Sequence, residues 1–153
     1  MIEKLEKIIQ KAFPIICDGS HTASELIVLG KYDSISDMIT DKLFLLKKHS
    51  PRNKIIEFVS FNHYNPTFEE VLIEFARRGL ERPDSEDAFY FGIQYPDEQK
   101  MLPIFFLHEP VHNSSGNRFI LALGGGLNQR YLYLSDFDSK WYWHCVFAAT
   151  RST

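Results

Sequence analysis

The chain has 153 residues, of which 44% are hydrophobic and 24% are charged, and its formal net charge is −3. This composition is ordinary for one globular domain, so we expect residues 1–153 to form a single domain. It excludes the strongly basic field that draws a protein to nucleic acid or anionic membranes, and no apolar run approaches the roughly 20 residues of a membrane span.

The first half of the chain predicts two helices, two strands and a candidate short helix. Apolar residues at positions 2, 5, 8, 9 and 12 recur at helical spacing, which predicts an amphipathic helix that ends before Pro14. Residues 26–29 predict a short strand, and Ser36 is a candidate cap for a short helix. Residues 54–60 predict a second strand. Thr67 and Glu70 have the spacing of a capping box, and Gly79 is placed to end the helix that follows.

The second half predicts one more helix and then a sheet. The helix starts near Ser85 and runs to Tyr95, where Pro96 ends it. Apolar and aromatic runs follow at 102–107, 118–123, 130–134 and 141–148, separated by turns rich in Gly, Asn, Asp and Ser. We therefore predict an α+β fold, with N-terminal and central helices packed on a C-terminal antiparallel β-sheet of four or more strands. A partly closed barrel and a C-type-lectin-like sheet are variants.

Three groups of segments resemble a family of small uncharacterised proteins of uncultured bacteria, over about residues 27–151. The segments are 29–33 with 39–41, 66–72 with 78–80 and 92–96, and 102–104 with 116–118 and 141–151. The resemblance implies no activity and no catalytic residue. The family is expected to have a small residue where this chain has His108 and Glu109.

Residues 108–112 read His-Glu-Pro-Val-His, the H-E-x-x-H pattern of zinc proteases. That pattern requires a helix, whereas Pro110 and the strand predicted before it oppose one. A looser metal site could still form from His108, His112 and His144, with Asp136 or Asp138 as a carboxylate ligand.

Two cysteine pairs suggest a nucleophilic thiol, Cys17 with His21 and Cys145 with His144. Neighbouring strand residues point to opposite faces, so His144 is poorly placed to activate Cys145. Cys145 instead shares a face with the aromatic residues at 141, 143 and 147, which predicts a core thiol. With only two cysteines and no secretory signal at the N-terminus, we expect a cytoplasmic protein with reduced thiols and no cofactor.

Aromatic side chains on the predicted sheet offer a binding surface. Tyr131 and Tyr133 share one strand face, and Tyr142 and His144 share another. If such a face is solvated, these residues could bind a sugar, peptide or base together with Asn128, Gln129 and Arg130. The alternative is that the rings only cover the sheet beneath the helices.

The leading functional prediction is therefore a non-catalytic recognition or interaction module, with a small molecule, glycan or protein as its ligand. Nucleic acid and membrane are not expected as partners. One alternative is a metal-assisted hydrolase that uses His108, Glu109, His112 and His144. The other is a structural partner that acts through homo-oligomerisation, for example as a homodimer. The sequence does not decide whether the protein is an enzyme, but it favours a protein without enzymatic activity.

Overall fold

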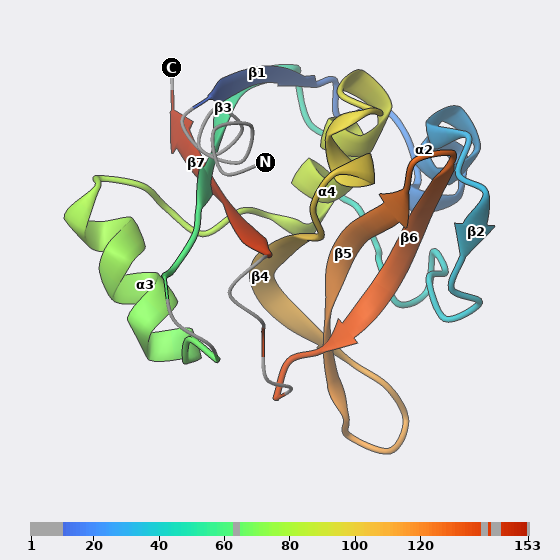
Figure 1. Ribbon diagram of the computed structural model, residues 1–153. Coiled ribbons are helices and arrows are strands. Elements are labelled where there is room, and N and C mark those ends of the chain that lie inside the picture. The colour runs from blue at the N-terminus through green and yellow to red at the C-terminus, as the bar shows by residue number, and fades with distance from the viewer. Residues whose placement is uncertain (1–10, 63–64, 139–140, 142–144, 153) are drawn as a thin grey trace.

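The computed structural model describes residues 11–62, 65–138, 141 and 145–152, which form helices around a seven-stranded sheet (Figure 1). The strands lie in the order β1-β3-β7-β4-β5-β6-β2. Their bounds are Ala12–Cys17 (β1), Ser34–Ile35 (β2), Arg52–Val59 (β3), Ile104–His112 (β4), Arg118–Gly126 (β5), Gln129–Asp136 (β6) and Val146–Ser152 (β7).

The sheet is mixed and open. β7 runs parallel to β4 and β2 runs parallel to β6, whereas the other neighbouring pairs are antiparallel. The prediction of a purely antiparallel sheet is therefore wrong, because β7 pairs between β3 and β4 instead of continuing beside β6. β1 and β2 are the two edges, so the sheet does not close and the barrel variant is wrong as well.

The helices confirm the local start and stop signals of the central region. α3 spans Phe68–Arg77, α4 spans Ser85–Gln94, and a short 3₁₀ helix, η1, covers Glu98–Lys100. The Thr67 hydroxyl accepts a hydrogen bond from the Glu70 N–H at 3.1 Å, and the Glu70 carboxylate accepts one from the Thr67 N–H. Gly79 follows α3 with φ of +69°, a backbone conformation in which glycine lacks the steric cost of a Cβ.

Three local predictions in the first forty residues are wrong. Residues 26–29 belong to a helix, α2 (Ala23–Gly30), which Thr22 and Glu25 begin with a second capping box. The residues before Pro14 begin β1 instead of ending a helix, and the rest of the predicted N-terminal helix lies outside the described residues. Ser36 follows the two-residue β2 and begins a turn, in which its carbonyl oxygen accepts a hydrogen bond from the Ile39 N–H.

The core lies on both faces of the sheet, because alternate residues of the central strands point to opposite sides. On one face Phe58, Phe106 and Leu121 pack with buried residues of α2 and α4. On the other face Phe147 and Ile120 pack with residues of α3, which lies apart from the other helices in Figure 1.

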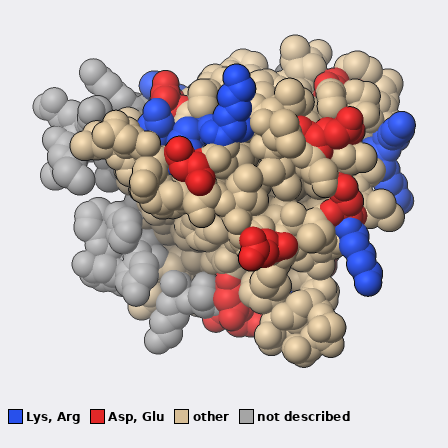
Figure 2. Space-filling model, turned by 90° about the vertical axis from the view of Figure 1, so that its right-hand side faces the viewer, with Lys and Arg blue, Asp and Glu red and all other residues tan. Residues whose placement is uncertain are grey.

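The surface mixes charges of both signs. Lys and Arg side chains are interspersed with Asp and Glu over the face shown in Figure 2. None of the helices in the described part of the chain has the length and apolar character needed to cross a bilayer.

Candidate functional site

His108 lies at a large bulge in β4 and is a structural residue. Phe106 pairs with Leu121 but Val111 pairs with Phe119, so residues 107–110 loop out opposite a single residue of β5. His108 is 1% exposed, and its Nε2 accepts the Leu121 N–H at 2.9 Å while Nδ1 donates to the Glu109 carbonyl at 2.7 Å. The side chain thus replaces a backbone acceptor that the bulge removes from the ladder.

This geometry does not support the metal-ligand role suggested for His108. Burial, above all, lowers the pKa of His108 to about 4, so the imidazole is neutral, and its only lone pair is already used by the Leu121 N–H. Glu109 is exposed and pairs with Arg82, and His112 is exposed at the end of β4. His144 lies outside the described residues. Within those residues the H-E-x-x-H side chains therefore do not converge.

Arg130, expected to bind a ligand, instead joins the ends of two helices. The side chain is buried, and its five N–H donors all have acceptors, which lie in or just after the last turns of α2 and α4 or in η1. The acceptors are the carbonyl oxygens of Gly30 (2.5 Å), Lys31 (3.5 Å), Gly92 (2.7 Å) and Pro96 (2.8 Å) and the side-chain oxygen of Gln99 (3.1 Å). A cation is favourable here because carbonyl groups at helix C-termini carry partial negative charge. Arg130 has no donor left for a ligand.

Tyr131 and Tyr133 do share one face of β6, as predicted. They are half-buried and line an open groove of about 530 Å³ together with Gly124, Gly125 and residues of β2. The Tyr131 hydroxyl donates to the side chain of Gln129, which with Asn128 lies exposed at the hairpin tip. Tyr142 and His144, the other half of the predicted surface, lie outside the described residues.

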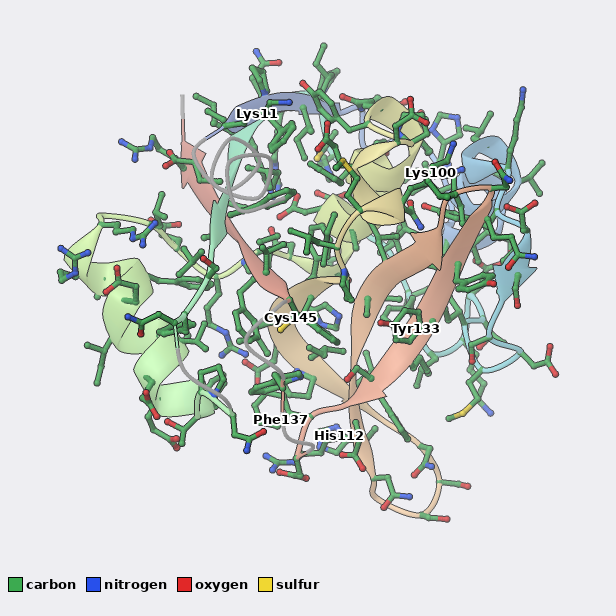
Figure 3. The ribbon with its side chains drawn as sticks, in the orientation of Figure 1. Lys11, Lys100, His112, Tyr133, Phe137 and Cys145 are labelled. Carbon is green, nitrogen blue, oxygen red and sulfur yellow. The ribbon has the colours of Figure 1, made fainter. Side chains whose placement is uncertain are left out.

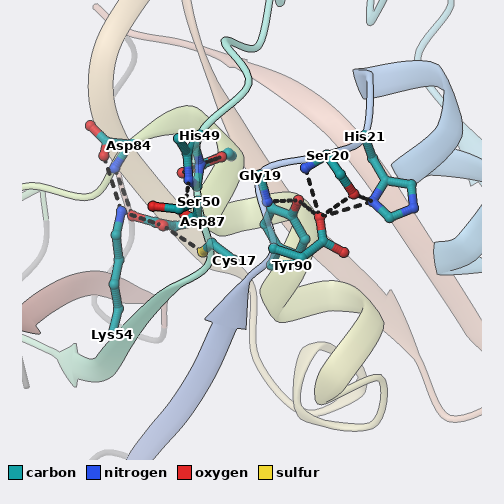
Figure 4. A network of polar contacts seen from close by, with 12 residues as sticks. Cys17, Gly19, Ser20, His21, His49, Ser50, Lys54, Asp84, Asp87 and Tyr90 are labelled. Atoms are coloured by element: carbon teal, nitrogen blue, oxygen red, sulfur yellow. Dashed lines mark hydrogen bonds and ion pairs between the residues drawn. The ribbon is translucent and has the colours of Figure 1, made fainter.

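A buried polar network connects the end of β1 to the start of α4 (Figure 4). Lys54 Nζ lies 2.8 Å from Asp87 Oδ1 and 3.0 Å from Asp84 Oδ2, and the Cys17 thiol donates to Asp87 at 3.5 Å. Burial by itself would lower the pKa of Lys54, but the Asp87 carboxylate and then Asp84 outweigh it and hold that pKa above its usual range.

Cys17, Glu86 and Asp87 are the group among the described residues whose donor atoms could surround a metal ion. Their charges are already balanced, since Lys54 pairs with Asp87 and His49 Nε2 lies 2.9 Å from both Glu86 oxygens. We therefore assign this group a structural role, as a set of buried ion pairs.

The thiol-nucleophile interpretation of Cys17 is not supported. His21 hydrogen-bonds with Asp18 at 3.0 Å and with Ser20, and Asp18 in turn accepts from Tyr90. Burial first, and then the carboxylates of Asp87 and Glu86, raise the pKa of Cys17 far above its ordinary value. The thiol therefore stays protonated and weakly nucleophilic. Cys145 is buried in the cluster that includes Trp141 and Phe147, as expected of a core thiol.

A cleft of about 610 Å³ opens where α3 begins, β4 bulges and β6 ends; we call it the α3–β4 cleft. Figure 3 shows Phe137 beyond the end of β6, well away from Tyr133 in the middle of that strand. The lining residues are Asn65, Pro66, Thr67, Phe68, Glu69, Arg82, Glu109, Pro110, Arg118, Phe137, Asp138 and Trp141.

Two guanidinium groups and two aromatic rings form the centre of this cleft. Arg82 lies over the ring of Phe68 at 5.0 Å, and Arg118 lies over the ring of Phe137 at 4.7 Å. The two rings contact each other edge to face, with their centroids 4.8 Å apart. Cation–π and aromatic contacts of this kind hold all four side chains in place.

Trp141 forms the inner wall of the cleft. It is 3% exposed and packs edge to face on Phe147, and its backbone carbonyl accepts the Asn65 N–H at 2.9 Å. The indole Nε1 is buried, with no hydrogen-bond partner among the described residues. An unpaired buried N–H costs about 1–3 kcal/mol, so it marks a position where an acceptor would be favourable.

The sequence did not reveal this cleft. Phe68 has the pattern of a core-facing helix residue, and Arg82 and Arg118 belong to no local motif. For Asp138 the sequence predicts only an alternative role as a metal ligand. These residues meet because the β4 bulge, the start of α3 and the end of β6 come together in three dimensions, and no spacing along the chain encodes that.

No protein-family model, curated protein or solved structure matches the chain. The resemblance to small bacterial proteins and the C-type-lectin-like variant therefore stay predictions, and the assignment of function depends on the geometry.

Proposed function

We propose that the protein is a non-catalytic recognition module that binds its ligand in the α3–β4 cleft. The observation that carries the proposal is the central stack, in which Arg82 and Arg118 lie over the paired rings of Phe68 and Phe137. Arginine and aromatic side chains fixed in a concave site provide both contact area and directional donors, which is typical of the residues that dominate binding energy.

The composition of the lining supports binding over catalysis. The described lining residues include no cysteine and no histidine. Thr67 is the hydroxyl-bearing residue among them, and its oxygen caps α3. The metal-assisted hydrolase predicted from the sequence uses His108, Glu109, His112 and His144. Of these, Glu109 alone is among the described lining residues, and its carboxylate pairs with Arg82.

The groove beside Tyr131 and Tyr133 is a second candidate site, favoured by the shared face and partial exposure of the two rings. It would suit a neutral ligand such as a sugar, because aromatic faces stack on sugar rings while the amides of Asn128 and Gln129 fix orientation. The proposed cytoplasmic location is supported by two buried cysteines, Cys17 and Cys145, that are not joined in a disulfide. A homodimer stays a prediction that light scattering over a range of concentrations would test.

The test of the proposed function is a fragment screen by ¹⁵N-HSQC, with neutral, acidic and basic compounds in the same library. We expect some fragments to change the chemical shifts of the amides of Phe68, Arg118 and Phe137 most strongly. These changes should disappear in the Phe137→Ala variant. Tyr133→Ala, which changes the other groove, is the matched control and should keep them. Fragments that change only the amide shifts of β6 would show that the binding site is the groove beside Tyr131 and Tyr133. A library in which no fragment binds in the α3–β4 cleft would refute the proposal.

A further inference from the structure

We propose that the α3–β4 cleft selects an aromatic ligand that carries an anionic oxygen group, such as an aryl phosphate or an aryl carboxylate. This inference depends on the proposed function, since it names the ligand class of the same cleft. It follows from the displaceable ion pairs of the two guanidinium groups, from the two rings that they cover, and from the indole N–H of Trp141.

The two arginines are fixed donors. Arg82 donates from Nε to the Leu107 carbonyl and from Nη2 to the His108 carbonyl, both at 2.9 Å, so its guanidinium is held by the bulge. Its Nη1 is directed to Glu109 at the longer distance of 3.3 Å. Arg118 is held on the ring of Phe137 and pairs through Nη2 with Asp138. Each guanidinium therefore has a terminal nitrogen that faces a carboxylate at the cleft, Glu109 for Arg82 and Asp138 for Arg118.

Those two carboxylates can be displaced. The side chains of Glu109 and Asp138 are 89% and 62% exposed. Exposed ion pairs contribute little to stability, because water solvates both partners well when they separate. A ligand anion can thus take the position of either carboxylate at a guanidinium that is already oriented, and a charge-assisted bond forms without ordering the arginine.

The rings favour a flat aromatic group over a cation. A cationic ligand would have to compete with Arg82 and Arg118, which already cover Phe68 and Phe137. A flat ring meets no such competition, since an aromatic group stacks well on the open side of a guanidinium plane. The Arg118 side chain is 42% exposed, so one side of this stack remains accessible.

Trp141 adds a further N–H donor to the cleft. Its buried Nε1–H lacks an acceptor among the described residues and belongs to the wall of the same cleft. The cleft thus favours a ligand with hydrogen-bond acceptors, such as phosphate or carboxylate oxygens. Because Nε1 is covered, an oxygen reaches it only after a small shift of neighbouring side chains, which would change the indole signal in NMR spectra.

The experiment is calorimetric titration of the full chain with phenyl phosphate, benzoate, phenol, inorganic phosphate and benzylamine. We expect phenyl phosphate to bind at least about tenfold more tightly than phenol or inorganic phosphate, benzoate to bind as well, and benzylamine not to bind. Arg118→Gln should weaken phenyl phosphate by about tenfold. Arg151→Gln is the matched control, since Arg151 also pairs with a carboxylate, that of Glu57 on β3.

A second variant separates loss of binding from loss of folding. Asp138→Asn removes a displaceable carboxylate, so phenyl phosphate should bind about threefold more tightly, whereas Glu57→Asn should change nothing. Unchanged affinity in both Arg118→Gln and Asp138→Asn, or preferential binding of benzylamine, would overturn the inference. If the two aryl anions fail while other fragments bind in the cleft, the ligand class is wrong and the proposed function stands; if no fragment binds there, both fall.

Discussion

Arg130→Ala should destabilise the fold strongly, although the sequence suggested a binding role for this residue. The substitution leaves five acceptors without their donor, and four of them are backbone carbonyls at the ends of α2 and α4. A hydrogen bond to a charged group contributes about 1.5–3 kcal/mol, and breaking a buried charged network typically costs about 3–5 kcal/mol because the bonds are not additive. The guanidinium also lies over the ring of Tyr32 at 4.6 Å, a contact that is lost as well.

We therefore expect the free energy of unfolding in urea to fall by about 3–5 kcal/mol, a large part of the stability of a small domain. Arg130→Lys should recover less than half of it, since an ammonium group cannot reach five acceptors in one plane. Arg151→Ala, at a half-exposed ion pair, is the control and should cost about 1 kcal/mol or less. A loss below about 1 kcal/mol in Arg130→Ala would refute the structural role and reopen the binding role.

Three further predictions concern buried groups. Burial, above all, lowers the pKa of His108 from 6.5 to about 4, so the stabilising contribution of the neutral imidazole is complete above pH 6.5 and is lost as the pH falls towards 4. Over this range the free energy of unfolding should change by at most about 1.4 kcal/mol per pH unit because of this residue. His108→Gln should remove this pH dependence from urea unfolding. Lys54→Met leaves Asp87 buried without its cation and should lower the free energy of unfolding by about 3–5 kcal/mol in the same assay. A loss no larger than that of Lys100→Met, at an exposed ion pair, would show that the buried network does not stabilise the fold. Iodoacetamide should leave Cys17 unmodified in the native protein and label it in urea, and peptide mass spectrometry that finds rapid native labelling would contradict the protonated, buried thiol.

The elements that were predicted correctly are those with a complete local signal. Thr67, Glu70 and Gly79 fix both ends of α3 within a dozen residues, and the runs at 118–123 and 130–134 form a hairpin because the turn between them is short. α2 has the same signal, in Thr22 and Glu25, but the apolar run at 26–29 by itself favours a strand. A short apolar run fits a buried strand and a short helix equally well, so the capping residues before it are the signal that distinguishes the two.

The rest could not be predicted because it depends on contacts between distant residues. The position of β7 beside β4 is set by packing on both faces of the sheet. Arg130 has the sequence context of a hairpin residue, and only its partner Gly30, one hundred residues away, shows that it is buried. His108 matches a metal-binding motif by its spacing alone. The bulge in β4, in which its ring nitrogens form hydrogen bonds with the backbone, cannot be predicted from a linear pattern.

The most direct test of the proposed site is a ¹⁵N-HSQC titration with phenyl phosphate that follows the indole N–H of Trp141, assigned with a Trp143→Phe variant. We expect this signal and the amides of Phe68 and Phe137 to move together and saturate with one affinity, while the amides of Tyr131 and Tyr133 stay still. Saturable shifts at the two tyrosines with an unmoved Trp141 indole would contradict it and place recognition on the hairpin groove instead.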